Sequence, residues 1–159
     1  MNQDFRDLLR VFNEEKVRYL IVGGYALIKH SEPRYTKDLD LWVSPDEENA
    51  RRVFQALIRY GAPLASMAPV DFTKAGYFFT MGLAPNRIDI LFDLKGLTFD
   101  SEWQRRVCDV IGDIDTCFLS RIDLIINKEA VGRKGGRREI ANCGNPGQER
   151  LVNDAFLLN

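Results

Sequence analysis

The stretch Tyr19-Leu20-Ile21-Val22-Gly23-Gly24 decides the expected fold of this chain. Its apolar and partly β-branched residues are typical of a buried strand that ends at the glycines. Residues 25–30 then suit a short helix. A glycine turn ahead of a helix can hold a phosphate, because its backbone N–H groups point outward at the positive end of the helix. We therefore expect a strand, a turn that suits phosphate and a helix in succession.

Three acids follow this turn at spacings that suit a metal site. In a strand over residues 38–43, Asp38 and Asp40 point to the same face as Trp42, and the apolar residues between them point to the other. Asp89 lies within a second apolar run, residues 87–92, and points away from its core-facing side chains. Carboxylates on neighbouring strands can hold Mg²⁺ together with substrate phosphates. The spacing thus predicts that the three acids share divalent cations beside the glycine turn.

The rest of the chain alternates helical and strand patterns. Apolar spacing predicts helices at residues 3–16, 45–60, 103–107 and 120–128, and strands at residues 17–22, 77–81, 87–92, 110–111 and 114–118. Ser44 is the expected cap of the second helix and Gly61 its end. The strands at 77–81 and 87–92 are expected to pair as an antiparallel hairpin. Residues 62–73 and the segment after Arg133 have no sustained period, so we expect irregular structure there.

The composition indicates one globular domain. The chain has 159 residues, of which 45% are hydrophobic and 28% charged, and its formal net charge is −1. This length can bury one core but hardly two domains. Near neutrality argues against nucleic-acid binding by the whole surface and leaves a local patch open. No apolar run approaches the ~20 residues that span a bilayer, and the first residues lack the pattern of a signal peptide. We expect a cytoplasmic protein that does not enter a membrane.

The cysteines are too few and too dispersed for a zinc site. Cys108, Cys117 and Cys143 form no CxxC pair, and the single histidine, His30, is distant from them in sequence. Reduced thiols are therefore expected, as is usual in the cytoplasm. We expect His30 to cap carbonyl groups or to favour the helix dipole rather than to act in catalysis.

Four segments together resemble the polymerase-β-type nucleotidyltransferase superfamily, above all its small bacterial branch. They are residues 23–27 (GGYAL), 34–40 (RYTKDLD), 87–89 (RID) and 124–133 (LIINKEAVGR). That branch includes aminoglycoside and lincosamide nucleotidyltransferases and abortive-infection toxins. The resemblance runs in order through most of the chain. It implies a nucleotidyltransferase-like domain over residues 1–133, followed by an irregular or weakly docked tail over residues 134–159.

The resemblance implies an α/β (α+β) nucleotidyltransferase fold, a mixed β-sheet with helices packed mainly on one side. It also implies an enzyme that moves a nucleoside monophosphate from a nucleoside triphosphate to an acceptor hydroxyl on a small molecule, an RNA such as tRNA, or a protein. By similarity, Asp38 and Asp40 would hold Mg²⁺ or Mn²⁺ that bridges the triphosphate. Asp89 would complete the second metal site and help to deprotonate the attacking hydroxyl, as in two-metal catalysis.

Other positions of the resemblance imply binding roles. Gly23 and Gly24 would let the backbone approach the triphosphate, and Arg34 and Lys128 are candidates for contacts with phosphate or substrate. A solvated surface position is the alternative for Arg34 and for Lys128. Trp42 either stacks on a base or packs beneath the loop.

Two other functions stay open. The first is a catalytically inactive nucleotide-binding protein, such as one component of a toxin–antitoxin pair, although the retention of Asp89 argues against it. The second is an interaction protein whose acids are ordinary surface residues. A chain of this length has no obvious second domain to recognise the acceptor, so we expect a partner protein or a homodimer to supply that surface.

The sequence departs from the resemblance after residues 132–133. The superfamily branch continues there with an acidic, helical segment. Residues 136–140 (GRREI) can be encoded by codons that read Asp-Val-Ala-Arg-Leu one base along. A frameshift, natural or in the recorded sequence, is therefore our hypothesis for the tail, and sequencing of the gene tests it.

Overall fold

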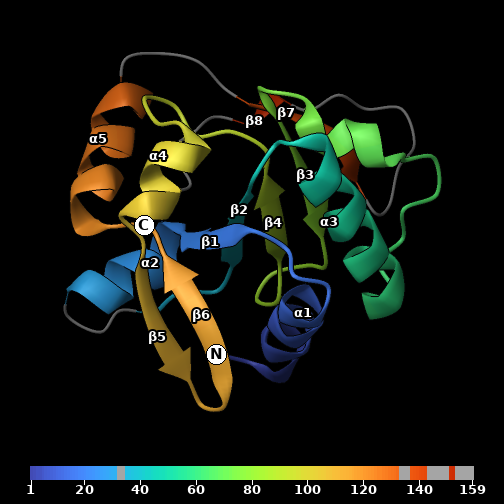
Figure 1. Cartoon of the computed structure of the whole chain (residues 1–159), viewed down its shortest axis with the longest axis horizontal. Coiled ribbons are helices and arrows are strands. Elements are labelled where there is room, and N and C mark those ends of the chain that lie inside the picture. Colours follow the sequence, from blue (N-terminus) through green and yellow to red (C-terminus); the bar gives the residue numbers. More distant parts are fainter. Residues whose placement is uncertain (32–34, 133–136, 143–150, 153–159) are drawn as a thin grey trace.

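A mixed β-sheet organises the molecule, and helices cover its faces (Figure 1). The computed structural model describes residues 1–31, 35–132, 137–142 and 151–152. The helices are α1 (Gln3–Glu14), α2 (Gly23–His30), α3 (Glu47–Tyr60), α4 (Phe99–Gln104) and α5 (Arg121–Val131), with a short 3₁₀ helix, η1 (Pro69–Thr73). The strands are β1 (Tyr19–Val22), β2 (Leu39–Val43), β3 (Tyr77–Met81), β4 (Ile88–Leu91), β5 (Val107–Ile111), β6 (Ile114–Phe118), β7 (Arg137–Asn142) and β8 (Leu151–Val152).

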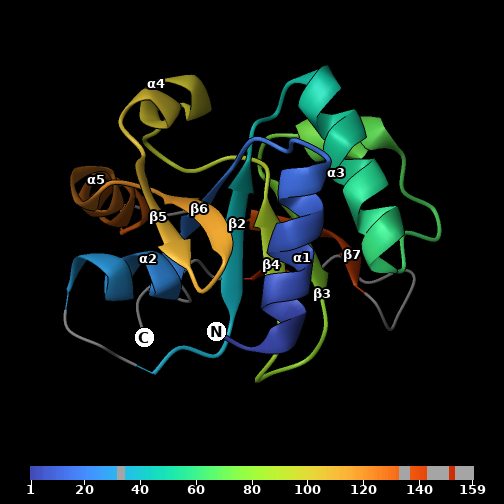
Figure 2. The same cartoon turned by 60° about the horizontal axis from the view of Figure 1, so that its bottom comes forward.

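The sheet combines parallel and antiparallel pairs in the strand order β5-β6-β1-β2-β4-β3-β7-β8. Strand β1 runs antiparallel to β2, whereas β2 and β4 are parallel neighbours in the middle of the sheet (Figure 2). Strands β3 and β4 form the expected antiparallel hairpin. This architecture confirms the α+β fold class that the sequence predicts.

Alternating side chains of β2 reach two separate cores. Leu39, Leu41 and Val43 are buried on one face, among residues of α1 and α3, which lie over that face in Figure 2. Trp42 points to the other face and packs edge-on against Phe99, with 5.0 Å between the ring centroids. The alternation expected for this strand is confirmed. Trp42 is a packing residue, because only 1% of its surface is exposed.

The cap of helix α3 is Asp46 and not Ser44 as expected. The Asp46 carboxylate accepts a hydrogen bond from the Asn49 backbone N–H at 2.8 Å, which satisfies one of the unpaired donors of the first turn. The Ser44 hydroxyl donates to the Asp46 carboxylate at 2.7 Å instead. Gly61 ends the helix in the left-handed conformation, at φ 87°, as the sequence predicts.

The helix expected at residues 103–107 lies further toward the amino terminus, because α4 spans Phe99–Gln104 and Val107 begins β5. Strands β5 and β6 pair as an antiparallel hairpin around Gly112, where φ is 68°. This hairpin confirms the two strands expected there and extends the first of them back to Val107. Pairing with β6 decides the conformation of these residues, and local propensity does not contain that tertiary contact.

Cys108 and Cys117 form a disulfide, which corrects the expectation of reduced thiols. The two residues are direct partners across the hairpin, with 4.0 Å between their Cα atoms. Their separation in sequence hid this pairing, because the position of the turn decides which residues face each other. Cys143 lies outside the described residues.

Most of the segment after Arg133 also lies outside the described residues. Within it the structure describes β7, which runs parallel to β3, and β8, which pairs with β7. The domain boundary near residue 133 and the frameshift both stay predictions. None of the described helices is long and apolar enough to cross a bilayer. A cytoplasmic location stays a prediction as well.

Candidate active site

The three acids come together around the parallel pair β2–β4. Asp40 and Asp89 are direct register partners on these strands, so their side chains leave the sheet on the same face. Asp38 comes immediately before the start of β2 at Leu39. The pairing of two strands that are distant in sequence thus brings together the residues that the sequence singled out.

The guanidinium of Arg87 contacts two of these carboxylates. Its Nη2 atom lies 3.0 Å from Asp38 Oδ2 and 3.1 Å from Asp89 Oδ2. Asp38 and Asp89 therefore share one nitrogen atom as a partner. Arg87 belongs to the motif at residues 87–89, and its local sequence predicts no role for it. Alternation along the strand puts Arg87 on the face of Asp89, but only the sheet pairing brings Asp38 within reach.

Asp89 is the most buried of the three acids. Its side chain is 10% exposed, and the Thr80 hydroxyl on β3 donates a hydrogen bond to its Oδ1 at 2.7 Å. Burial raises the pKa of Asp89 above its ordinary value, and the negative charge of Asp38 adds to the rise, while the Thr80 hydrogen bond and Arg87 oppose it. A carboxylate with a raised pKa accepts a proton more readily than an ordinary one. Thr80 was missed in the sequence, because only the hairpin register puts it opposite Asp89.

The carboxylates of this site are the type of ligand that suits a magnesium ion, but the described side chains form no ready three-ligand cluster. Carboxylate oxygens are ligands that Mg²⁺ prefers, and Asp38 Oδ1 is buried without a hydrogen-bond partner among the described residues. Within the described part of the chain, no three His, Cys, Asp or Glu side chains are gathered closely enough to hold a metal ion. Arg87 instead supplies the positive charge that Asp38 and Asp89 contact. A cation bound here would have to displace this guanidinium or share the carboxylates with it.

The glycine turn lies directly against Asp40. Gly23 has φ +60°, and a Cβ atom at this position would overlap Asp40 Oδ2 and lie 2.8 Å from Asp40 Cγ. A Cβ atom on Gly24 would overlap Thr36 Oγ1 and lie 3.0 Å from Thr36 Cβ. Only glycine lets the backbone pass this close to both side chains. The turn that suits phosphate and the face that carries the acids are therefore in contact.

The amino terminus of α2 offers backbone donors at this turn. The helix begins at Gly23, two residues earlier than expected, and its N-cap residue, Val22, makes no side-chain capping hydrogen bond. The first N–H groups of a helix have no partner within the helix, and the helix dipole adds positive character at this end. This end of α2 can therefore bind an anionic group such as a phosphate.

A cavity of about 320 Å³ opens beside the turn and extends to α5. Its lining includes Gly23, Gly24, Leu124 and Lys128. Its size falls at the lower end of the range for small-molecule sites. The structure thus brings Lys128 to the same cavity as the glycine turn, whereas Arg34 lies outside the described residues.

Two further polar residues of this cavity have partners in the fold. His30 Nε2 lies 2.8 Å from the carbonyl oxygen of Leu119, which follows β6 and not the helix of His30, so the expected capping of its own helix is not the contact it makes. Asn127 is 5% exposed, and its Nδ2 donates to the Lys95 carbonyl at 2.9 Å. Asn127 fastens α5 to the segment that follows β4. No local signal in the sequence marks this contact, because its two residues belong to different elements.

A solved structure shares this fold. It is the crystal structure of a proposed nucleotidyltransferase from Thermotoga maritima, with a TM-score of 0.58 and 16% sequence identity, over 81% of this chain and 83% of that chain. No protein-family pattern matches the chain, and no curated protein sequence matches it. The nucleotidyltransferase fold expected from the sequence is therefore confirmed. The resemblance to the aminoglycoside, lincosamide and abortive-infection branches stays a prediction.

Proposed function

We propose that this protein is a Mg²⁺-dependent nucleotidyltransferase, which moves a nucleoside monophosphate from a nucleoside triphosphate to an acceptor hydroxyl. One observation carries the proposal: Asp40, the register partner of Asp89, stands directly beside the turn at Gly23. The turn offers backbone donors to a phosphate, and the acids offer oxygen ligands to a divalent cation. The fold that the chain shares with a proposed nucleotidyltransferase supports the same class of reaction.

The nucleotide is bound by three parts of the chain in this proposal. The triphosphate lies at the amino terminus of α2, where Gly23 and Gly24 allow close approach of the backbone. Asp38, Asp40 and Asp89 are the ligands for Mg²⁺ or Mn²⁺, which neutralises phosphate charge and polarises the phosphoryl group when bound. Lys128 reaches the phosphates or the acceptor from α5, and Arg34, which lies outside the described residues, is a candidate for a second contact of this kind.

The proposed reaction is a displacement at the α-phosphorus. The acceptor oxygen forms a bond to this phosphorus, the bond from the α-phosphorus to the oxygen that bridges to the β-phosphate breaks, and pyrophosphate leaves with that electron pair. Asp89 accepts the proton of the acceptor hydroxyl, and its raised pKa favours this role. Arg87 keeps Asp38 and Asp89 side by side before the nucleotide arrives.

Transfer of label from each α-labelled nucleoside triphosphate tests the proposal. The protein is incubated with Mg²⁺ and three acceptor classes: antibiotics with free hydroxyls, tRNA, and the proteins of a cell extract. Label should attach covalently to one class, and Asp38→Asn or Asp40→Asn should abolish the transfer. Asp115→Asn, at an exposed position of β6, is the matched control and should leave transfer unchanged. Undiminished transfer by both site variants would refute the mechanism.

A catalytically inactive nucleotide-binding protein is the second candidate, and the position of Arg87 favours it. Its guanidinium contacts the two carboxylates that a cation would need. A protein of this kind, for instance one half of a toxin–antitoxin pair, would bind the triphosphate without Mg²⁺ and transfer nothing. Calorimetry with and without Mg²⁺, together with the label assay, separates the two candidates. Only the active nucleotidyltransferase needs a surface that binds the acceptor. A partner protein or a second copy of the chain would supply that surface.

A further inference from the structure

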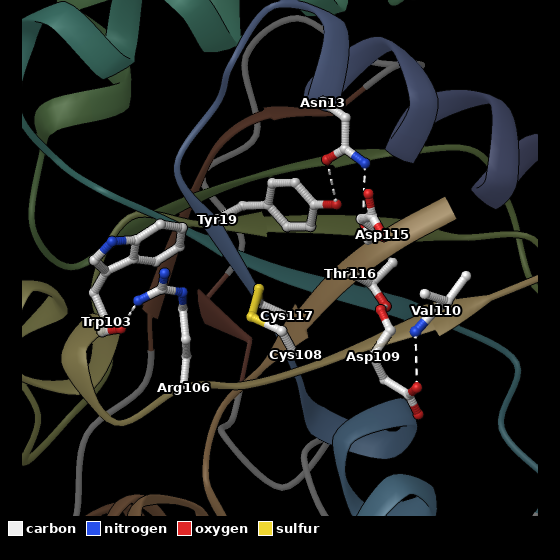
Figure 3. Close-up of a disulfide and its surroundings, with 10 residues drawn as sticks. All are labelled: Asn13, Tyr19, Trp103, Arg106, Cys108, Asp109, Val110, Asp115, Thr116 and Cys117. Atoms are coloured by element: carbon white, nitrogen blue, oxygen red, sulfur yellow. Dashed lines mark hydrogen bonds between the residues drawn. A yellow bond between two sulfur atoms is a disulfide. The ribbon is translucent and has the colours of Figure 1, made fainter. Parts of the chain in front are cut away.

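A disulfide joins the two strands of the β5–β6 hairpin (Figure 3). Cys108 is exposed and Cys117 is half-buried. Both line a cavity of about 440 Å³, together with Tyr19 and Trp103. A thiol reagent can therefore approach the sulfur of Cys108 from solvent.

The disulfide also joins the edge strand β5 covalently to β6. Strand β5 lies at one end of the sheet order, so β6 is its one neighbour among the described strands. The bridged pair is the second of five register pairs, counted from the open end of the hairpin. A covalent bond at this place keeps the open end closed, where a two-stranded ladder frays most easily.

Helix α2 is tied to this hairpin at its carboxyl end. Lys29 forms an ion pair with Asp109, and His30 Nε2 lies 2.8 Å from the Leu119 carbonyl oxygen. Asp109 and Leu119 each lie within two positions of a bridged cysteine. The last two residues of α2 thus depend on the position of the two strands that the disulfide joins.

The Asp109 carboxylate is itself held in place. It accepts a hydrogen bond from the Val110 backbone N–H at 2.8 Å, drawn in Figure 3. Lys29 lowers the pKa of Asp109, and the Val110 hydrogen bond adds to this effect. The carboxylate therefore stays charged at neutral pH and keeps its contact with α2.

We propose that Cys108–Cys117 is a redox site that controls nucleotide binding through α2, an inference that rests on the proposed function of the turn at Gly23. The amino terminus of the same helix begins at Gly23 and presents the donors for phosphate. In this proposal α2 moves as a unit, so that loosening its carboxyl end displaces its amino end as well. The oxidised protein is the binding form, and reduction weakens the binding of nucleotide.

The switching step is thiol–disulfide exchange with a dithiol reductant. One thiolate of the reductant attacks Cys108 Sγ, the bond between the two cysteine sulfurs breaks, and Cys117 leaves as a thiolate that takes up a proton. The second thiolate of the reductant then attacks the reductant sulfur of the mixed disulfide. Cys108 leaves as a thiolate and is protonated in turn. The reductant departs as a disulfide and has supplied both electrons.

Hydrogen exchange of α2 tests the coupling without any nucleotide. The full chain is purified without reductant, and one half is treated with dithiothreitol. Alkylation followed by mass measurement should find two more reactive thiols after reduction. Amides at residues 26–30 should then exchange about fivefold faster, the effect of losing one hydrogen bond. A double variant, Cys108→Ser with Cys117→Ser, should exchange like the reduced protein under both conditions.

Asp109→Asn tests whether the ion pair between Lys29 and Asp109 couples the disulfide to α2. It retains both cysteines and removes the charge that Lys29 contacts, so reduction should change α2 exchange less than in the original protein. Equal numbers of reactive thiols before and after reduction would overturn the redox site. Unchanged α2 exchange on reduction would overturn the coupling. A full response in Asp109→Asn would overturn the route through Lys29.

Titration with ATP and Mg²⁺ separates this inference from the proposed function. The dissociation constant should rise about tenfold on reduction, a common size for coupling between two sites, and the double variant should not respond to dithiothreitol. Equal affinity in both redox forms would overturn control of the site, although nucleotide binds. If neither form binds any nucleoside triphosphate while α2 exchange still responds, the proposed function fails and the redox coupling of α2 is supported.

Discussion

The backbone of Gly23 passes so close to the carboxylate of Asp40 that a Cβ atom on the glycine would overlap Asp40 Oδ2. Val22 and Asp40 are register partners across the antiparallel pair β1–β2, so the end of β1 brings the glycine turn to the acid. Asp89 stands beside Asp40 on β4. Asp40 of β2 therefore lies next to both the glycine turn, which suits a phosphate, and Asp89, with which it could bind a cation.

Gly23→Ala should abolish nucleotide binding and destabilise the fold. The alanine would collide with Asp40 and would need φ +60°, so we expect a loss of about 2–4 kcal/mol in the free energy of unfolding, measured in urea. Gly61→Ala is the control, because Gly61 has φ +87° and nothing within 4 Å of a Cβ atom. Equal losses in both variants would mean that backbone conformation alone explains the effect.

The free energy of unfolding should depend on pH because burial raises the pKa of Asp89. Burial raises the pKa of Asp89 in the folded protein, so the folded state holds this proton more tightly than the unfolded chain does. The resulting stability is present below the unfolded pKa of about 3.9 and is lost as the pH rises through the raised folded pKa. Asp89→Asn does not titrate, so its unfolding free energy relative to the original protein should increase across this window. A difference that stays flat with pH in urea unfolding would contradict the burial effect.

Thr80→Val should move the pH dependence of nucleotidyl transfer to higher pH. The Thr80 hydroxyl donates to Asp89 and lowers its pKa, and valine keeps the shape of the side chain without the donor. The pKa of Asp89 then rises further, so the deprotonated base forms only at higher pH. A pH profile of the initial transfer rate measures this shift. Thr73→Val on η1 is the control, and an identical profile in Thr80→Val would exclude Asp89 as the base.

Arg87→Met should destabilise the protein and make it responsive to Mg²⁺. The change leaves Asp38 and Asp89 together without their shared positive partner, and we expect a loss of about 1–3 kcal/mol in unfolding free energy. Mg²⁺ should restore part of it, because a cation then neutralises both carboxylates. Thermal unfolding with and without MgCl₂ is the measurement. Arg59→Met, which loses ion pairs to Glu14 and Glu15, should show no such restoration. If Mg²⁺ does not change the thermal unfolding of Arg87→Met, the result would favour the function of an inactive nucleotide-binding protein.

Lys128→Ala should weaken the binding of nucleoside triphosphate by about tenfold, because it removes a charge from the wall of the cavity. The effect should shrink as salt is added, since screening weakens contacts between exposed charges and phosphate. Calorimetric titration at two ionic strengths measures both quantities. Arg51→Ala on α3 removes an equally positive residue from another surface and serves as the control. Unchanged affinity would assign Lys128 to the solvated surface.

Sequence patterns that span only a few residues correctly predicted the strands that carry the site. Alternation over residues 38–43 separated the faces of β2, and the two glycines marked the end of β1. These patterns succeed because the direction of a side chain along a strand depends only on neighbouring residues. The predicted cap of α3 was wrong, because the Asp46 carboxylate accepts the hydrogen bond from the Asn49 amide and the Ser44 hydroxyl donates to Asp46 instead. The helix expected at 103–107 extended too far, because α4 ends at Gln104 and Val107 pairs with Phe118 of β6.

The sequence by itself determined that β2 presents acids on one face and that β1 ends in a turn open to phosphate. Backbone periodicity and the missing side chain of glycine act within a few residues, so their effects can be foreseen locally. Only the tertiary structure decided that Asp89 stands beside Asp40, that Arg87 contacts two carboxylates, and that two cysteines face each other. These relationships depend on strand register, which the packing of whole sheet faces and the positions of turns decide.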